Sequence, residues 1–403
     1  MAGLSLALLL VVGTLAWVVL DEDPYVAPPP DRAPPTAEPA LAAEVLLDLE
    51  RAVATGDADL AASLAPQEDR ASRRNLAALA DNARALRVQD FTLRYVDEDG
   101  AVSTDGTWSA AVDATWAFGG FDDAPARSEV GFRFVVEDGA AALADIGGAD
   151  RRTPLWMDGP VEVRRTAESL VLVDGTPRAA DLYGRLARRA VPDVRAVLPD
   201  RSLGLVVEVP GSVAALHDAL AADDEEYGAI AAVTTTADGS LAPDAPVHVF
   251  VNPVVFAGLE PAGSQVVMSH EAVHVATDAA TNSTMPLWLL EGFADYVALR
   301  DVELPTSTTA GQIIKQVRRK GPPAHLPGPQ EFDTTTTQLG SAYEAAWLAC
   351  RLLADVGGED ALVRFYERVN DGGVLGAALQ QEFGLTRRDL TRQWQALLTD
   401  LAA

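Results

Sequence analysis

The sequence predicts an α+β protein with an N-terminal transmembrane helix, a first unit of helices and strands, and a second unit that ends in helices. Three observations predict it. Residues 1–20 carry no charged side chain. Residues 41–150 pass from helical apolar periodicity to strand-like alternation, and residues 160–403 pass from mixed patterns to helical ones alone. We therefore expect two α+β domains behind a membrane anchor.

Composition limits the classes of function. The 403 residues carry a net charge of −28, and Lys315 and Lys320 are the only lysines. Such an acidic protein repels nucleic acid, so we expect no nucleic-acid partner. Cys350 is the single cysteine. An intramolecular disulfide and a multi-cysteine metal site are therefore excluded, and a metal here needs histidines and carboxylates.

The first twenty residues, MAGLSLALLLVVGTLAWVVL, are about the length that spans a bilayer. A secretory signal peptide is the alternative, but no basic residue and no convincing cleavage site precede Asp21. We expect an uncleaved signal-anchor, residues 1–20, that makes a single-pass protein of the cell membrane with its bulk extracytoplasmic. Residues 21–40 form a linker, whose seven prolines favour an extended spacer of roughly 3 Å per residue.

Residues 41–150 are predicted to be one domain. Helical patterns cover 42–64 and 73–86, and alternation with a period of two covers 91–95, 108–118 and 130–136. Helices followed by a curled antiparallel sheet resemble the cone-shaped nuclear-transport-factor-like (SnoaL-like) fold. No catalytic pair of residues stands out in it, so we expect a spacer or binding domain.

Residues 160–403 are predicted to form a second domain. Its first half mixes strands and helices: a hairpin in 161–175, helices over 177–197 and 212–227, and strands over 203–209, 229–236 and 246–253. Only helical patterns follow. His217 and His248 fall in a helix and a strand, and we expect both to be structural. Residues 247–258 are a candidate edge strand on which a peptide could pair.

The segment MSHEAVHVATD, residues 268–278, carries the chemistry. Ser264 can cap a helix that runs to about Ala280. On it, His270 and His274 are four residues apart, so both imidazoles project from one face and can share a tetrahedral ion. Glu271 is placed to take a proton from a metal-bound water. Such strings also occur in proteins that bind no zinc, so the assignment of a zinc site depends on whether the sequence offers a third ligand.

The segment MPLWLLEGFADYVAL, residues 285–299, offers that ligand. Pro286 suits the first turn of a helix, on which Glu291 and Asp295 share one face. Glu291 can complete a zinc site, and Asp295 can accept the second ring N–H of a ligand histidine. The alternative for Glu291 is a solvated carboxylate, but apolar neighbours suggest that this face is buried, where a lone carboxylate is costly.

Together these motifs resemble the gluzincin (thermolysin-like, peptidase MA-like) zinc metallopeptidases, over about residues 200–400. The resemblance implies that His270, His274 and Glu291 bind Zn²⁺, that Glu271 is the general base and that Asp295 supports a zinc-bound histidine. One departure is the spacing: sixteen residues separate His274 from Glu291, fewer than in thermolysin-like enzymes.

Some gluzincins use a tyrosine on a later helix to stabilise the oxyanion, which makes Tyr343 a candidate catalytic residue. The alternative is that Tyr343 belongs to a core stripe with Ala346, Trp347 and Cys350. His325 is a rival donor in a loop.

The resulting hypothesis is a membrane-anchored zinc metallopeptidase, a hydrolase that cleaves peptide or protein substrates. An endopeptidase is favoured because the Gly-x-Met-Glu-Asn motif of related aminopeptidases is missing. One alternative is a peptide- or cell-wall-binding module on an inactive or slow peptidase scaffold. Another is an N-terminal domain that binds the partner and positions the zinc domain. No pattern indicates an oligomeric state.

Overall fold

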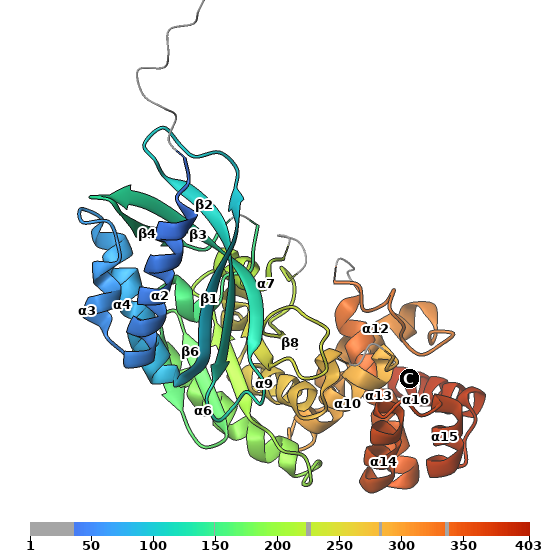
Figure 1. The fold of residues 1–403 in the computed structure, drawn as a ribbon. Coiled ribbons are helices and arrows are strands. Elements are labelled where there is room, and N and C mark those ends of the chain that lie inside the picture. The colour runs from blue at the N-terminus through green and yellow to red at the C-terminus, as the bar shows by residue number, and fades with distance from the viewer. Residues whose placement is uncertain (1–35, 149, 223–226, 282–283, 335–337) are drawn as a thin grey trace, which may run out of the picture.

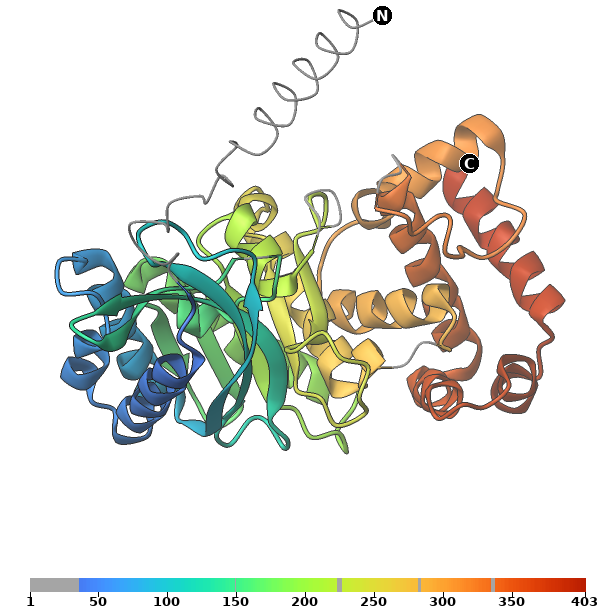
Figure 2. The ribbon, with the colours of Figure 1, turned by 45° about the horizontal axis from the view of Figure 1, so that its top comes forward.

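The computed structural model describes residues 36–403, apart from residue 149 and the segments 223–226, 282–283 and 335–337. The described chain is α+β, as predicted. The N-terminal unit and the C-terminal helices lie at opposite ends, and a second sheet lies between them (Figures 1 and 2).

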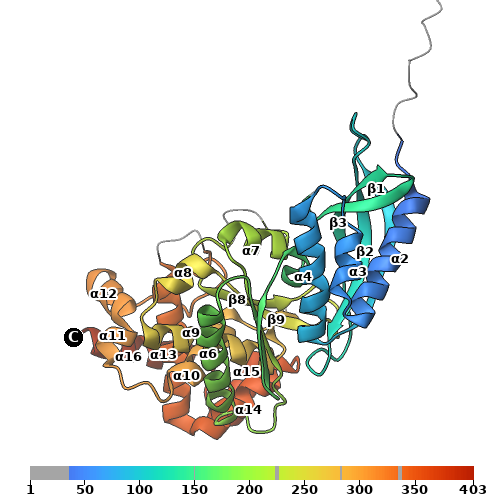
Figure 3. The same cartoon turned by 90° about the vertical axis from the view of Figure 1, so that its left-hand side faces the viewer.

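Three helices and a four-stranded antiparallel meander form the N-terminal unit, and the helices lie along one face of its sheet (Figure 3). These elements are α2 (Pro39–Thr55), α3 (Ala58–Ser63), α4 (Arg70–Leu86), β1 (Val88–Asp99), β2 (Trp108–Phe118), β3 (Ala126–Glu137) and β4 (Ala140–Ile146). The pattern over 42–64 is split into α2 and α3, because Gly56 adopts a left-handed φ of 65° and Asp57 caps the next helix through Leu60 N. The alanine-rich β4 was not predicted.

The second sheet has five strands in the order β5-β6-β7-β9-β8. Its strands are β5 (Glu162–Arg165), β6 (Ser169–Val173), β7 (Leu205–Val209), β8 (Ala232–Thr236) and β9 (Val247–Val251). β6, β7 and β9 are parallel, whereas β5 and β8 are antiparallel edges. The prediction of an edge strand over 247–258 is wrong, because β9 lies between β7 and β8. The edge is β8.

Helices cover one face of this sheet, and the N-terminal unit covers part of the other. The helices beside this sheet are α5 (Leu155–Asp158), which precedes β5, α6 (Pro177–Arg195) and α7 (Val213–Leu220), which connect strands, and α8 (Pro253–Ala257) and α9 (Pro261–Ala276), which follow β9. On β6, Leu170 and Leu172 belong to the core of the N-terminal unit, and Val171 and Val173 belong to the core shared with α6 and α9. The parallel strands are therefore buried on both faces.

A buried histidine lies where the two sheets meet. His248 of β9 is fully buried, its Nδ1 lies 2.7 Å from Glu208 Oε1, and its Nε2 lies 3.1 Å from Asp122 Oδ1. The ring stacks on Phe118 of β2 with 5.3 Å between ring centroids. Burial disfavours the charged ring, but Asp122 and Glu208 outweigh it and raise the pKa of His248 to about 10. His248 is thus a buried contact between the sheets.

Helices form the rest of the chain, as predicted. A short 3₁₀ helix, η1 (Ala279–Thr281), follows α9, and the others are α10 (Leu287–Leu299), α11 (Thr306–Thr309), α12 (Gly311–Lys320), α13 (Leu339–Gly357), α14 (Glu359–Asn370), α15 (Leu375–Phe383) and α16 (Arg387–Ala402). They extend the core of the second sheet through buried aromatic side chains such as Phe293, Tyr366 and Trp394.

The predicted transmembrane helix and single-pass membrane localisation are contradicted. Within the described residues, no helix has both the length and the apolar content needed to cross a membrane. The longest described helices, α6 and α13, both have 19 residues and carry several charged side chains, including Glu344, Arg351 and Asp355 of α13. Residues 1–20, on which the prediction was based, lie outside the described residues.

Candidate metal centre

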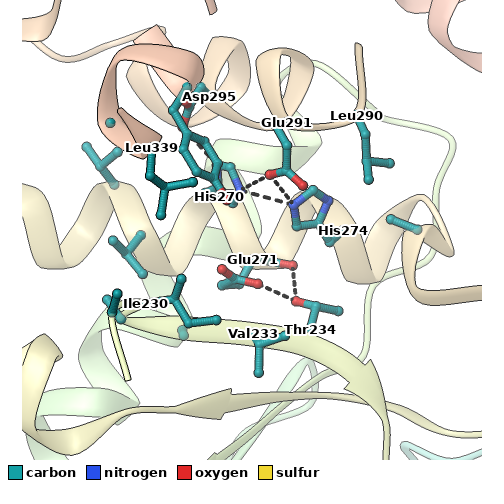
Figure 4. A pocket seen from close by; sticks show the side chains of 18 of the residues that line it. Ile230, Val233, Thr234, His270, Glu271, His274, Leu290, Glu291, Asp295 and Leu339 are labelled. Atoms are coloured by element: carbon teal, nitrogen blue, oxygen red, sulfur yellow. Dashed lines mark hydrogen bonds and ion pairs between the residues drawn. The ribbon is translucent and has the colours of Figure 1, made fainter. Parts of the chain in front are cut away.

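Helix α9 brings two histidines together. It begins at Pro261, three residues before the predicted cap Ser264, since proline suits a first helical turn. His270 and His274 are 8 % and 7 % exposed. Their ring planes are nearly perpendicular, with centroids 4.7 Å apart, and their Nε2 atoms lie 3.0 Å apart. The i,i+4 spacing thus aims both Nε2 atoms at one point (Figure 4).

Helix α10 crosses α9 and adds two carboxylates. Glu291 Oε2 lies 3.1 Å from His270 Nε2 and 3.4 Å from His274 Nε2. One turn later, Asp295 Oδ1 accepts a hydrogen bond of 2.8 Å from His270 Nδ1. This bond leaves the Nε2 of a neutral His270 with a free lone pair directed at His274 and Glu291.

A glycine lets α10 approach α13 closely. A Cβ on Gly292 would lie 2.4 Å from the carbonyl oxygen of Ala346 and 3.1 Å from Cys350 Sγ. The residue after Glu291 therefore has no room for a side chain. Behind α9, Tyr366 Oη donates to Thr277 Oγ1, and Asn370 Nδ2 donates to the carbonyl oxygen of Thr277. Both helices that carry the candidate ligands are thus held by the C-terminal helices.

The donor atoms fit a zinc ion. His270, His274 and Glu291 offer two ring nitrogens and a carboxylate oxygen that all lie within 4.8 Å of one another. A tetrahedral ion with bonds of about 2.0–2.1 Å separates its ligand atoms by about 3.3 Å, close to the distances found here. His274 departs from the usual pattern: its Nδ1 is buried and has no hydrogen-bond partner in the described part of the chain.

The local charges favour a cation. Burial disfavours a charged imidazole, but Asp295 and Glu291 outweigh it and raise the pKa of His270 well above its ordinary value. Burial also disfavours the Glu291 carboxylate, but His274 and His270 outweigh it and lower the pKa of Glu291. Glu291 thus stays negatively charged at the point where the two Nε2 atoms meet, which suits a divalent cation.

A cavity of about 480 Å³ opens over these side chains. Residues 229–234, including the first half of the edge strand β8, form one wall, and Leu290, Leu339 and Tyr343 contribute to the others. Glu271 lines the cavity beside the histidines, and Thr234 Oγ1 donates to its Oε2 at 2.6 Å (Figure 4). The threonine-rich string VTTT is a weak hint of a polar strand face. The contact itself depends on the order of the strands, which the sequence does not reveal.

Tyr343 reaches the cavity, whereas His325 does not. The Tyr343 ring centroid lies 6.0 Å from that of His270, and its edge packs on Phe332. Burial, with the nearby carboxylates, raises the pKa of Tyr343, so the phenol keeps its proton. Ala346, Trp347 and Cys350 are buried in the core, as the stripe predicted. His325 is exposed and is not among the described residues that line the cavity.

Comparison with known proteins adds little. No family model matches the chain, and no curated protein matches it. Two crystal structures of a variant M1 zinc metallopeptidase from Deinococcus radiodurans are distantly similar. One has 14% identity and a TM-score of 0.37 over 65% of this chain and 58% of that chain. The other, bound to a Tyr-Ser-Ala substrate, has 13% identity and a TM-score of 0.38 over 75% and 62%.

The chain thus spans less than two thirds of the length of either structure. Likeness at this level carries no functional argument. The resemblances to gluzincins and to the nuclear-transport-factor-like fold stay predictions.

Proposed function

We propose that the protein is a zinc-dependent peptidase whose metal is held by His270, His274 and Glu291. The observation that supports it most is the convergence of two Nε2 atoms and one carboxylate oxygen beside Glu271, in a cavity with a strand edge as one wall. Three protein ligands leave a fourth position of a tetrahedral ion for water or substrate, which is typical of catalytic rather than structural zinc.

A bound zinc ion would lower the pKa of its water and polarise the scissile carbonyl. Glu271 would take the proton of the attacking water and pass it to the leaving amine. Asp295 would hold the His270 ring in the tautomer that leaves Nε2 free, through the bond of 2.8 Å to Nδ1. Tyr343, which keeps its proton, would donate to the oxygen that becomes negatively charged in the transition state.

The cavity wall suits a peptide substrate. β8 pairs with β9 on one side only, so its other edge can form main-chain hydrogen bonds with an extended peptide. The wall is otherwise apolar, with Ile230, Val266 and Val267 among its residues. The carboxylates among the described lining residues are Glu271, Glu291 and Asp295, all assigned above. Among the described lining residues, no further carboxylate is left to bind a free α-amine, which favours endopeptidase action.

The domain division of the chain also stays a proposal: residues 41–150 as a spacer or binding domain and residues 160–403 as the peptidase domain. The separate helices and meander of the first unit support it. The shared core through Leu170, Leu172 and Val206 means that the two domains pack as one body in the described structure.

The test compares the full-length protein with Glu271→Gln. Hydrolysis is followed with a library of quenched fluorescent peptides, and zinc per chain is measured by elemental analysis. We expect hydrolysis by the wild type, a loss of at least roughly 10²-fold in the variant, and unchanged zinc in both. Wild type that contains zinc and binds peptides without cleaving them would favour the binding-module alternative. A folded wild type without zinc would contradict the metal site itself.

A further inference from the structure

We propose that Thr234 is a positioning residue for the general base, because its hydroxyl fixes the Glu271 carboxylate and leaves Oε1 as the oxygen that takes the proton from water. The inference rests on the proposed peptidase function and deepens it. It assigns a role to the edge strand β8 besides forming the cavity wall.

The contact is close and specific. Thr234 Oγ1 lies 2.6 Å from Glu271 Oε2 and 3.2 Å from the main-chain oxygen of the same residue. In the described part of the chain, Thr234 is the one hydrogen-bond partner found for the Glu271 carboxylate, and Oε1 has none. Figure 4 shows the side chain of Thr234 rising from β8 toward Glu271 on α9.

The geometry of one strand explains why Thr234 faces Glu271. Side chains alternate along β8, so Thr234 shares a face with Ala232 and Thr236, whereas Val233 and Thr235 lie on the other face. α9 packs against β8, which brings Glu271 over that first face. Thr234 is paired with Val249 of β9, so the sheet holds the backbone of the threonine in place.

A hydroxyl at 2.6 Å from a carboxylate oxygen makes a charge-assisted hydrogen bond, which is stronger than a neutral one. Thr234 reaches both the tip and the main chain of Glu271. The contact therefore restrains the rotatable bonds of a side chain that would otherwise sample several rotamers in the cavity. With Oε2 occupied, Oε1 is the oxygen left to face the water. A small displacement of such a base costs rate rather than substrate affinity.

A purely structural role would look different. Glu271 is 7 % exposed, so the hydroxyl also satisfies a buried carboxylate, and losing it should cost some stability in either case. Stability alone therefore does not separate the two roles. The positioning role alone predicts that kcat falls while KM and zinc content stay the same, and that the effect vanishes when Glu271 can no longer act as a base.

Four variants of the full-length zinc-loaded protein test this. Thr234→Val keeps the shape and removes the hydroxyl, and Thr234→Ser restores the hydroxyl. Thr235→Val makes the same change at the next residue of β8, which points to the other face and is not among the described residues that line the cavity. Thr234→Val combined with Glu271→Gln measures the coupling between the two residues. We expect kcat to fall roughly tenfold in Thr234→Val with less than about a twofold change in KM. Thr234→Ser should recover most of kcat, and Thr235→Val should match the wild type.

In the Glu271→Gln background, adding Thr234→Val should cause no further loss. A second measurement is independent of turnover. A peptidyl hydroxamate, whose hydroxyl would face Glu271, should bind Thr234→Val severalfold more weakly than wild type in calorimetry, and Thr234→Ser should bind like the wild type.

Four results distinguish a failure of the inference from a failure of the proposed function. If the wild type cleaves peptides and Thr234→Val has the same kcat and hydroxamate affinity, the positioning role is wrong and the peptidase proposal stands. The positioning role would also be overturned if Thr234→Val lowered kcat by the same factor in the wild type and in Glu271→Gln. If the wild type binds neither zinc nor the hydroxamate, the peptidase proposal fails, and the inference fails with it. If the wild type binds the hydroxamate without cleaving peptides, the peptidase proposal fails. The role of Thr234 is then decided by whether Thr234→Val binds the hydroxamate more weakly than the wild type does.

Discussion

Asp295 of α10 accepts a hydrogen bond of 2.8 Å from His270 of α9, and this bond joins the two helices that carry the candidate metal ligands. It directs the other ring nitrogen of His270 at His274 and Glu291. The orientation of the proposed ligands thus depends on a residue that would not touch the metal.

Replacing Asp295 by Asn should therefore weaken zinc binding while the protein stays folded. Asparagine can still accept the hydrogen bond, but it lacks the charge that makes the imidazole a better ligand. We expect zinc affinity to fall roughly 10- to 100-fold, measured by competition with a chromogenic chelator. Asp301→Asn, in an exposed acid just beyond the same helix, is the control and should bind zinc like the wild type. Equal affinities for all three proteins would exclude the supporting role of Asp295.

Tyr343→Phe separates the catalytic role of this residue from its packing role. The ring packs on Phe332 in both forms, so the fold and the zinc content should not change. If the hydroxyl stabilises the oxyanion, kcat should fall by roughly 10²-fold in steady-state peptide hydrolysis. Tyr296→Phe is the matched control, since Tyr296 Oη donates to Glu359 and lies outside the residues that line the cavity. An unchanged kcat in Tyr343→Phe would leave Tyr343 with a packing role only.

The candidate site was more predictable than its surroundings, because its parts depend on short-range geometry. The i,i+4 spacing on one helix is enough to bring His270 beside His274, and the same spacing relates Glu291 to Asp295 on the next helix. The crossing of those helices depends on tertiary packing, but the buried, apolar context of Glu291 indicated that its face was covered. For these reasons the predicted ligands, the predicted base Glu271 and Asp295 lie together in the structure.

The strand arrangement could not be predicted in the same way. Period-two alternation locates a strand but does not say which strands are neighbours. β9 was therefore expected at the edge, and the contact of Thr234 with Glu271 was not foreseen. Local turn chemistry was also underestimated at Gly56, which ends one helix where a continuous pattern suggested a single long one. The segment 1–20 was a third limit, because its length, its lack of charge and the lack of a cleavage site were taken to indicate a membrane anchor.

Gly292→Ala should destabilise the protein although alanine is the better helix former. The added methyl group would collide with the main chain of α13, which cannot rotate away as a flexible side chain could. We expect a loss of about 1–3 kcal/mol in the free energy of unfolding, measured with urea. Gly263→Ala in α9 is the control, because its Cβ would lie 3.8 Å from Leu259 Cβ, an ordinary contact. That variant should be as stable as the wild type or up to about 1 kcal/mol more stable. Similar stability for both variants would contradict the close packing of α10 on α13.

His248 should make stability depend on pH between about 6.5 and 10. Its pKa is raised to about 10 in the folded protein by Asp122 and Glu208, against the opposing effect of burial, and it returns to about 6.5 on unfolding. The folded state therefore binds this proton more tightly. The stabilisation is fully present below about pH 6.5 and is lost as the pH rises through 10, because each unit above 6.5 favours the unfolded state until the folded ring also loses its proton.

The measurement is the free energy of unfolding in urea at a series of pH values from 6 to 10, for the wild type and for His248→Gln. The difference between the two proteins in the free energy of unfolding should shrink toward high pH by roughly a few kcal/mol. His325→Gln is the control, since this exposed histidine has one hydrogen bond within the described residues, to the neighbouring Leu326 oxygen, and its curve should follow that of the wild type. If the difference between wild type and His248→Gln is constant over this range, His248 is neutral in the folded protein. The contact between the sheets would then depend on packing against Phe118 and on neutral hydrogen bonds, rather than on a buried charge.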